Sequence, residues 1–343
     1  MTTSGKHQLA WVFDLNKCIG CQTCSVACKV LWPEGEEGTD HMWWMTVNTQ
    51  PGRGTPIDWE SMGGGRDADG KVVIGKIPTD EEFGGGWDYN YDEVLRGGKG
   101  RSVHLEKIAG SKTWGPNWDE DEGGGEWPNA YYFYLPRMCN HCTDAPCVEA
   151  CPSNAMFKRE EDGLVLRNED LCQGTKQCGA ACPYKKIYFN EVRGVSQHCI
   201  GCFPRLEQNV APACVRQCPG RAVHVGFLDD PKSSVARLVN EWKVAVPLHS
   251  EYNTKPNVYY VPPLAPAPLN ADGSANESKD RIPPEYLESL FGKAVHGALS
   301  ALKAEMAKKR NGQGSDVLDT LIIYEWKDAL GPFTRDPAEI VWM

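Results

Sequence analysis

The chain has 343 residues, room for one large or two ordinary domains, and its 36 Lys and Arg against 46 Asp and Glu give a formal net charge of −10. This acidic balance argues against a nucleic-acid binder, which needs a basic surface. The sequence has no run of 18 or more apolar residues, so no segment is predicted to span a bilayer on its own.

The N-terminal segment leads into the first of four cysteine groups. Residues 1–18 contain neither a continuous apolar stretch nor a twin-arginine pair, so no secretory signal is predicted and any export should depend on a partner. The run LAWVFDL, from residue 9, is predicted to form a β-strand. The group that follows has the spacing C-x2-C-x2-C-x3-C, by which bacterial ferredoxins hold iron–sulfur clusters. Its members are Cys18, Cys21, Cys24 and Cys28.

A cysteine-free insertion follows, from residue 29 to residue 138, with 20 of the 35 glycines and 8 of the 12 tryptophans. Its GGG triplets at 63–65, 84–86 and 123–125 are predicted to lie in loops, and Asp67-Ala-Asp-Gly reads as a turn rather than a calcium loop. The tryptophans either pack this segment onto the cysteine-rich part or form a docking surface for another subunit. Those considered are Trp43, Trp44, Trp59, Trp87, Trp114 and Trp118.

The remaining cysteines form three further groups, and the predicted strands LVLRN and IYFNEV lie on either side of the third group. The second group is spaced C-x2-C-x4-C-x3-C and the last C-x2-C-x11-C-x3-C, whereas the third has Thr175 where the ferredoxin template has a cysteine. Four quartets less this one position account for all 15 cysteines. The members are Cys139, Cys142, Cys147 and Cys151; Cys172, Cys178 and Cys182; and Cys199, Cys202, Cys214 and Cys218.

Thiolates at this spacing suit iron bridged by sulfide, because both are soft partners and one short loop can reach three corners of a cube. Pro152, Pro183 and Pro219 follow the last cysteine of their groups and should direct the exit of the chain, whereas Lys29 stands at this position in the first group. Two alternatives remain open. Disulfides would leave one cysteine unpaired, and zinc sites also use C-x2-C pairs.

The region after Cys218 differs in pattern. SSVARLVNEW is predicted to be a short amphipathic helix, VYYVPPLAPAPL an extended segment, and residues 284–309 two helices broken near Gly292. The predicted fold is therefore α+β, with two bacterial-ferredoxin-like units, a large loop-rich insertion and a helical C-terminal clamp. The expected domains are a first unit of two clusters at 1–28 and 183–228, the Gly- and Trp-rich insertion at 29–138, a second unit of two clusters at 139–182, and the C-terminal region at 229–343.

Several longer motifs resemble one family. FDLNKCIGCQTCSVACK, GPNWDEDEGGGE, YLPRMCNHC, CPYKKIYFN and EWKVAVPLHSEYNTKPNVYYVPP resemble the iron–sulfur β subunits of the nitrate reductase branch of the complex iron–sulfur molybdoenzymes, from about residue 9 to about residue 310. The short join between Cys218 and EWKVAVPLH is most similar to the type II DMSO-reductase-family group of ethylbenzene and dimethyl sulfide dehydrogenases and selenate, chlorate and perchlorate reductases.

The resemblance implies an electron-transfer subunit between a molybdenum bis-pterin (bis-MGD) catalytic α subunit and, in most members, a haem b γ subunit. It also implies crossed ligation, in which each group lends its last cysteine to a neighbouring cluster. The implied sets are Cys18, Cys21, Cys24 and Cys218; Cys28, Cys199, Cys202 and Cys214; Cys139, Cys142, Cys147 and Cys182, each for a [4Fe-4S] cluster; and Cys151, Cys172 and Cys178 for a [3Fe-4S] cluster.

The fourth set departs from the family, which often has a large aromatic residue at the position of Thr175. A threonine hydroxyl is a poor iron ligand, so a three-iron cluster is predicted; a four-iron cluster with an oxygen ligand is the alternative. His141 and His198 lie beside cluster cysteines, where donation to sulfur is expected rather than ligation.

No catalytic acid, base or nucleophile is identified, so the chain is expected to transfer electrons within an oxidoreductase complex rather than to bind substrate. A free-standing enzyme with an open iron and a purely structural metal module are the competing classes. Export to the periplasm together with the catalytic subunit, in a heterotrimer, is expected. The alternative is a cytoplasmic nitrate reductase or nitrite oxidoreductase β subunit.

Overall fold

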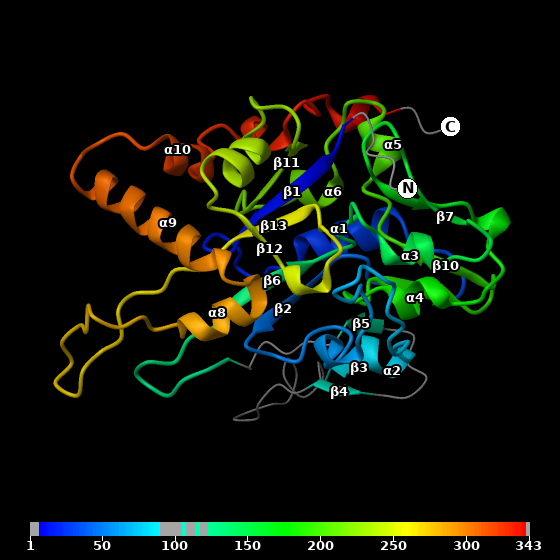
Figure 1. Cartoon of the computed structure of the whole chain (residues 1–343), viewed down its shortest axis with the longest axis horizontal. Helices are drawn as coiled ribbons and strands as arrows, with labels where there is room; N and C mark the ends of the chain where they lie inside the picture. Colours follow the sequence, from blue (N-terminus) through cyan, green and yellow to red (C-terminus); the bar gives the residue numbers. More distant parts are fainter. Residues whose placement is uncertain (1–6, 90–104, 108–113, 117–122, 341–343) are drawn as a thin grey trace, which may run out of the picture.

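A four-stranded sheet joins the N-terminal strand to three strands that follow the last cysteine group (Figure 1). Its order is β11 (Val223–Phe227), β1 (Leu9–Asp14), β13 (Val258–Val261) and β12 (Val246–Pro247). Strand β1 runs antiparallel to β11 and parallel to β13. All six residues of β1 are buried, because neighbouring strands and packed helices cover both faces, and this explains the continuous apolar run predicted as a strand.

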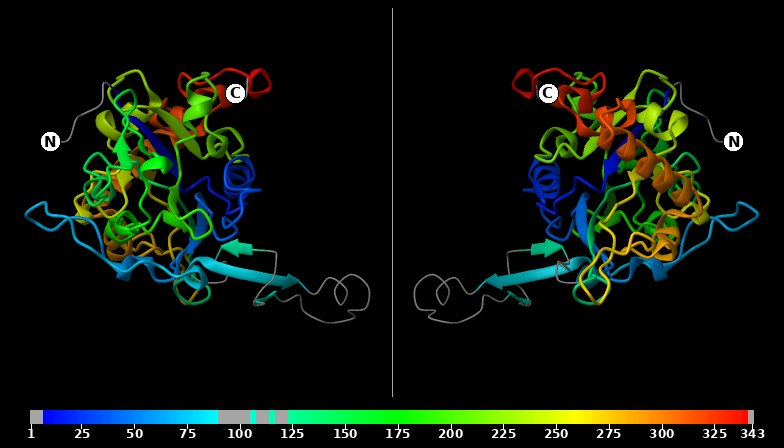
Figure 2. Two further views of the ribbon diagram at one scale, coloured as in Figure 1. Left: turned by 90° about the vertical axis from the view of Figure 1, so that its right-hand side faces the viewer. Right: turned by 90° about the vertical axis from the view of Figure 1, so that its left-hand side faces the viewer.

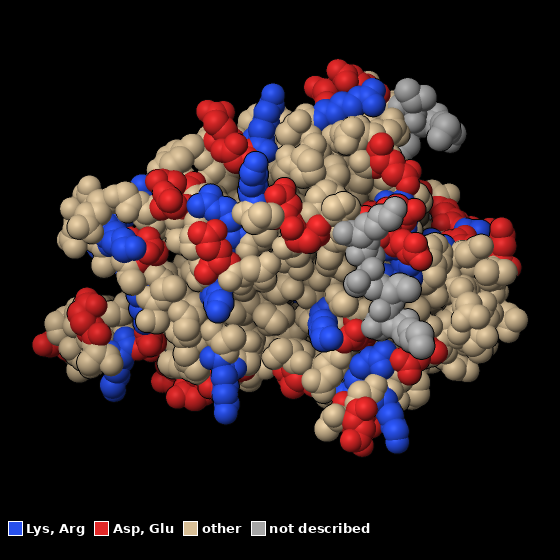
Figure 3. All heavy atoms as spheres, turned by 45° about the horizontal axis from the view of Figure 1, so that its top comes forward, with Lys and Arg blue, Asp and Glu red and all other residues tan. Residues whose placement is uncertain are grey.

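The computed structural model describes residues 7–89, 105–107, 114–116 and 123–340, with the backbone alone for those between 86 and 116. No helix in this part of the chain combines the length and the apolar content needed to cross a bilayer. Acidic and basic side chains are interspersed over the face shown in Figure 3.

Four short helices carry the cysteine groups, and they pack in two pairs. Helix α1 (Thr23–Leu31) packs against α6 (Ala213–Arg216), and α3 (Pro146–Glu149) packs against α4 (Gln177–Ala181). In three of the groups a proline follows the last cysteine directly and the helix ends before it, because proline lacks the N–H that would continue the helix. Helix α1 continues past Cys28 because Lys29 stands at that position, and its ammonium group binds the carbonyl oxygen of Thr39 at 2.6 Å.

Two antiparallel hairpins flank these helices. The first pairs β7 (Met156–Lys158) with β8 (Val165–Arg167), and the second pairs β9 (Ile187–Asn190) with β10 (Val195–His198). Strands β8 and β9 confirm the two strands predicted around the third cysteine group. The short helix α5 (Phe203–Leu206) follows the second hairpin.

The insertion is closed at its base by strand pairing. Strand β2 (Thr46–Gln50) pairs antiparallel with β6 (Phe133–Arg137), and all five residues of β2 are buried. Between these strands lie a 3₁₀ turn (Trp59–Met62) and helix α2 (Asp80–Phe83).

The prediction for the second glycine triplet was wrong. Residues 84–86 begin strand β3 (Gly84–Tyr89), which pairs with β4 (Leu105–Lys107) and β5 (Trp114–Pro116) and extends away from the body (Figure 2). Pairing with a partner about 30 residues away in sequence outweighs the local turn preference of glycine.

The tryptophans of the insertion divide between core and surface. Trp44 and Trp59 are buried, as the packing interpretation predicts, whereas Trp127 is exposed. The side chains of Trp87 and Trp114, and Trp118 altogether, lie outside the described residues.

The C-terminal region follows the predicted pattern. Helix α7 (Ser234–Ala236) continues into a π-helical turn (Arg237–Glu241), and α8 (Pro284–Phe291) and α9 (Ala294–Arg310) are separated at Gly292, whose φ of 68° few other residues adopt. Helix α10 (Asp316–Ile322) precedes the last turns. Apolar residues of α8 and α9 belong to the same hydrophobic core as those of β1. The predicted turn at Asp67 is confirmed, since its carboxylate accepts the backbone N–H of Asp69 and Lys71.

Candidate metal centres

Three cavities bring together cysteines that are far apart in the sequence. None of the 15 cysteines forms a disulfide, and all except Cys21 are buried or half-buried. Among the described residues, no three His, Cys, Asp or Glu side chains could hold a single metal ion; the cysteines line cavities instead. We number the cavities after the cysteine sets that they contain. The first cavity contains Cys18, Cys21, Cys24 and Cys218; the second Cys28, Cys199, Cys202 and Cys214; the fourth Cys151, Cys172 and Cys178, together with Thr175.

The thiols of the third set, Cys139, Cys142, Cys147 and Cys182, lie close enough together to shift the pKa of one of them. Burial, and then the charges of Cys182, Cys139 and Cys142, raise the pKa of the Cys147 thiol well above its ordinary value. Cys139 also lies close to Cys199, because its backbone N–H donates to the Cys199 sulfur. The third set of thiols, to which Cys139 belongs, therefore lies directly beside the second cavity.

Each helix presents two cysteines one turn apart, and this explains why the sets cross between groups. Residues i and i+4 lie on the same side of a helix, one above the other. Helix α1 thus has Cys24 at the first cavity and Cys28 at the second, while α6 has Cys214 at the second and the following Cys218 at the first. Two packed helices can in this way line two adjacent cavities.

The loops before these helices share a backbone conformation. The residue directly before the second position of each group has a left-handed φ: 66° at Gly20, 43° at His141, 67° at Gly174 and 62° at Gly201. This turn directs backbone N–H groups at the first sulfur of the loop. The N–H of His141 lies 3.4 Å from Cys139 Sγ, and that of Gly201 lies 3.4 Å from Cys199 Sγ.

The local geometry of the first group is repeated at Thr175. Gly20 and Gln22, on either side of Cys21, have φ of 66° and 59°, while Gly174 and Lys176, on either side of Thr175, have φ of 67° and 58°. The backbone therefore presents Thr175 as it presents Cys21, and Thr175 lines the fourth cavity.

Burial opposes ionisation of these thiols in the absence of a cation. Burial, together with the charges of neighbouring thiolates, raises the pKa of Cys24, Cys142 and Cys199 to about 12. Bringing four thiolates together is thus unfavourable unless metal cations compensate their charge. Sulfur donors of this number and softness fit iron–sulfur clusters.

Indole rings line the second cavity. Trp32 donates its Nε1–H to Cys202 Sγ at 3.2 Å, and Trp11 and Trp44 also belong to the wall. No local pattern indicates these contacts, since Trp11 looks like an ordinary residue of a buried strand.

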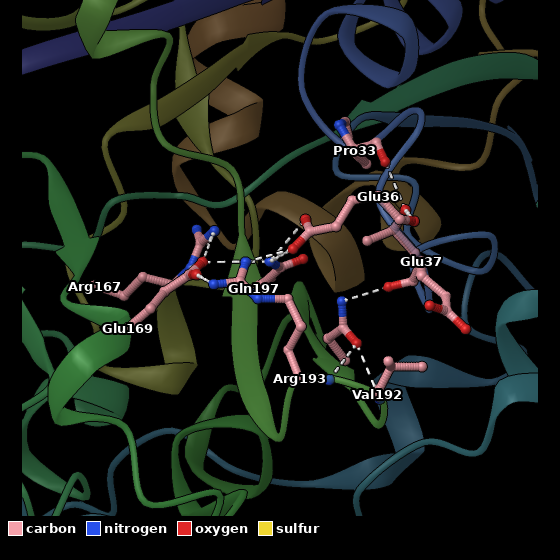
Figure 4. A network of polar contacts seen from close by, with 10 residues as sticks. Pro33, Glu36, Glu37, Arg167, Glu169, Val192, Arg193 and Gln197 are labelled. Atoms are coloured by element: carbon pink, nitrogen blue, oxygen red, sulfur yellow. Dashed lines mark hydrogen bonds and ion pairs between the residues drawn. The ribbon is translucent and has the colours of Figure 1, made fainter.

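A charged network adjoins the fourth cavity (Figure 4). Arg167 lines that cavity and binds the carboxylate of Glu169 at 2.6 Å. Glu169 also binds Arg193 at 2.6 Å, and Arg193 pairs with Glu36 of the insertion. Gln197 donates to both Glu36 and Glu169. The half-buried guanidinium of Arg167 is thereby held at the wall by a chain of charges that leads to the surface.

The two histidines predicted to donate to sulfur use Nδ1 for protein contacts, while Nε2 of each ring is buried without a protein partner. At His141 the backbone N–H, and not the ring, approaches sulfur, while ring Nδ1 accepts the N–H of Val165 at 3.2 Å. His198 Nδ1 donates to the carbonyl of Cys199 at 2.7 Å, so this nitrogen is not available to sulfur. Burial lowers the pKa of His141 to about 3, so its ring is neutral.

Comparison with known proteins agrees with this geometry. A family model described as a 4Fe-4S dicluster domain matches residues 130–228. The chain is 52% identical to the selenate reductase β subunit of Thauera selenatis, over 95% of this chain and 99% of the relative. It is 50% identical to the dimethylsulfide dehydrogenase β subunit of Rhodovulum sulfidophilum, over 93% and 97%. It is also 50% identical to the respiratory nitrate reductase β subunit of Haloferax mediterranei, over 92% and 90%.

Proposed function

We propose a detailed role for this chain from one premise: it belongs to the family of iron–sulfur β subunits of the type II DMSO-reductase-family molybdoenzymes. Members of this family are electron-transfer subunits, and the chain has the dicluster domain that this function requires. The observation that carries the proposal is the gathering of cysteines from distant groups around separate cavities.

The proposed content is three [4Fe-4S] clusters and one [3Fe-4S] cluster, which when bound supply a series of one-electron carriers. The ligand sets are the crossed ones: Cys18, Cys21, Cys24 and Cys218; Cys28, Cys199, Cys202 and Cys214; Cys139, Cys142, Cys147 and Cys182; and Cys151, Cys172 and Cys178. The helices α1, α6, α3 and α4 support this assignment, because each lends cysteines to two adjacent sites. Thr175 at the wall of the fourth cavity supports the three-iron form.

Iron analysis tests this content. The purified complex should contain, within this chain, one iron fewer than four complete four-iron clusters would give, and the oxidised complex should show the paramagnetic signal of a three-iron cluster. A full complement of iron without that signal would contradict the three-iron assignment. A variant Cys202→Ser should lose the second cluster alone, and unchanged iron in this variant would contradict the ligand sets.

The proposed partners are a molybdenum bis-MGD catalytic subunit at the first cluster and a haem b subunit at the fourth. Cys21 is exposed, and Ile19 beside it is 64% exposed, which supports a partner that covers the first cavity. Relatives about equally similar to this chain are named for selenate, dimethylsulfide and nitrate, so the catalytic subunit, and not this chain, is proposed to select the substrate.

The proposed location is the periplasm, reached together with the catalytic subunit. The short join after Cys218, typical of the selenate and dimethyl sulfide group, supports this location. Cell fractionation tests it: the chain should appear in the periplasm only when the catalytic subunit has its own export signal. Recovery on the cytoplasmic side of the membrane would favour the alternative, a nitrate reductase or nitrite oxidoreductase β subunit.

A further inference from the structure

Three indole rings from separate parts of the chain surround the second cavity. Trp11 lies in β1, Trp32 directly after α1, and Trp44 in the loop before β2. The other non-cysteine residues of the wall are apolar or lack a side chain. They are Met45, Met138, Ile200, Gly201 and Pro212. Among the residues lining this cavity, the indoles thus supply the side-chain N–H donors.

One of these donors already has a sulfur partner. Trp32 Nε1 lies 3.2 Å from Cys202 Sγ, within the distance of an N–H···S hydrogen bond. Cys202 belongs to the set proposed for the second cluster.

The other two donors are buried without a protein partner. The Nε1–H groups of Trp11 and Trp44 are buried and donate to no acceptor among the described residues, and the two residues are 0% and 5% exposed. A buried N–H is nearly always paired in a native protein, so each should have an acceptor in the complete molecule.

The faces of both rings are occupied by packing. The Trp11 ring stacks on His141, with centroids 5.5 Å apart, and the Arg167 guanidinium lies 5.5 Å from the centroid of Trp44. An indole donates in the plane of its ring, so these contacts leave the N–H edge free to donate.

We infer that Trp11, Trp32 and Trp44 donate hydrogen bonds to the sulfur atoms of the cluster held by Cys28, Cys199, Cys202 and Cys214, and thereby raise its reduction potential. This inference rests on the proposed function. Thiolate and sulfide sulfurs become more negative when the cluster is reduced, so donated hydrogen bonds stabilise the reduced form more than the oxidised one. Trp32 and Trp44 of the insertion, and Trp11 of β1, thus tune the potential of an electron carrier.

Pulsed EPR on the intact reduced complex tests the contacts directly. With ¹⁵N placed at the tryptophan Nε1 atoms, the signal that disappears in Cys202→Ser should show ¹⁵N coupling. If that signal shows no such coupling, the inference is overturned. If Cys202→Ser removes no cluster, the proposed function itself fails, so the two failures are distinguishable.

Redox titration of variants tests the effect on potential. Trp44→Phe and Trp11→Phe keep an aromatic ring but remove the N–H, and each should lower the midpoint potential of the second cluster alone. Trp43→Phe is the matched control, because Trp43 Nε1 is also buried and unpartnered but Trp43 does not line the second cavity. In this variant the midpoint potential of the second cluster should match that of the wild type. A second cluster with the wild-type midpoint potential in both Trp44→Phe and Trp11→Phe would overturn the inference. The ¹⁵N experiment decides the question even where a variant does not fold.

Discussion

Lys186 donates a hydrogen bond from its buried ammonium group to the hydroxyl of Tyr188 at 3.2 Å. Its other partners are Thr46 Oγ1 at 3.1 Å and the carbonyl of Trp43 at 3.3 Å, and no carboxylate of the described residues pairs with it. A buried cation without an anion is costly. Burial, and then the charge of Arg137, lower the pKa of Lys186 well below its ordinary value, whereas the thiolates of Cys28, Cys199 and Cys182, on the second and third sets, favour its charged form.

Lys186→Met should therefore lower the potentials of the second and third clusters. A unit charge at about 8 Å with an effective dielectric constant of about 20 contributes about 2 kcal/mol, or roughly 90 mV for a one-electron couple. EPR-monitored titration of the complex measures both potentials. The exposed Lys255, paired with Asp144, provides the control Lys255→Met. Unchanged potentials in Lys186→Met would mean that the ammonium is neutral or compensated elsewhere.

The charges at the fourth cavity predict two shifts of opposite sign. Arg167→Gln removes a cation from the wall and should lower the potential of the fourth cluster, whereas Glu169→Gln removes the anion behind it and should raise that potential. Each shift should be several tens of millivolts, from the same estimate of about 2 kcal/mol or less per charge. Arg193→Gln, an exposed member of the network, should change little because water screens it. Shifts of the same sign in both variants would contradict this account.

Thr175→Cys should convert the fourth site. The backbone at Thr175 repeats that at Cys21, so the new thiol is presented toward the cavity and can bind a fourth iron. We expect the oxidised three-iron signal to disappear and the cluster to titrate at a markedly lower potential, because ligand charge and cluster type both change. Electron flow through the complex should then fall. A retained three-iron signal at an unchanged potential would show that Thr175 only packs there.

Ile19→Lys should weaken assembly with the catalytic subunit. Ile19 is 64% exposed and lines the first cavity. Val26 and Val30, one turn apart on helix α1, are also exposed. A charge buried in an interface without a partner costs several kcal/mol, so the amount of co-purified catalytic subunit should drop at least tenfold. Val192→Lys, at an exposed position on a hairpin turn, is the control. Full recovery of the complex from Ile19→Lys would place the catalytic subunit elsewhere.

His224 should make the fold sensitive to mild acid. Burial lowers the pKa of His224 to about 3, whereas the unfolded side chain titrates near 6.5. Between these pH values the unfolded state binds the extra proton, so stability falls by about 1.4 kcal/mol per pH unit as pH drops below about 6.5. His224→Gln removes this contribution. The thermal midpoint should then fall less between pH 7 and pH 5 in the variant than in the wild type, and equal losses would contradict the assignment.

The insertion shows what packing adds to a composition argument. Its glycines and tryptophans predicted loops and either packing or docking, but not that Trp32 and Trp44 would reach one cavity. Glycine 84 to glycine 86 form a strand because β5 pairs with them, a partner that local preference does not reveal.

The local part of the candidate sites follows from the order of residues along the chain. The spacing i and i+4 places two cysteines of each group on one side of a helix, and the prolines mark where three of the helices end. The absence of a cysteine at Thr175 can also be read directly from the sequence. Such features depend on neighbours within one turn, where backbone geometry is set by the residues themselves.

Which distant side chains surround each cavity depends instead on how the strands and helices pack together. Trp11, Lys186 and Arg167 come from separate strands and loops, and their positions depend on the pairing of β1 with β11 and β13 and on the packing of α1 against α6. Burial then gives these groups their effect, because charges and N–H donors act more strongly where water is excluded.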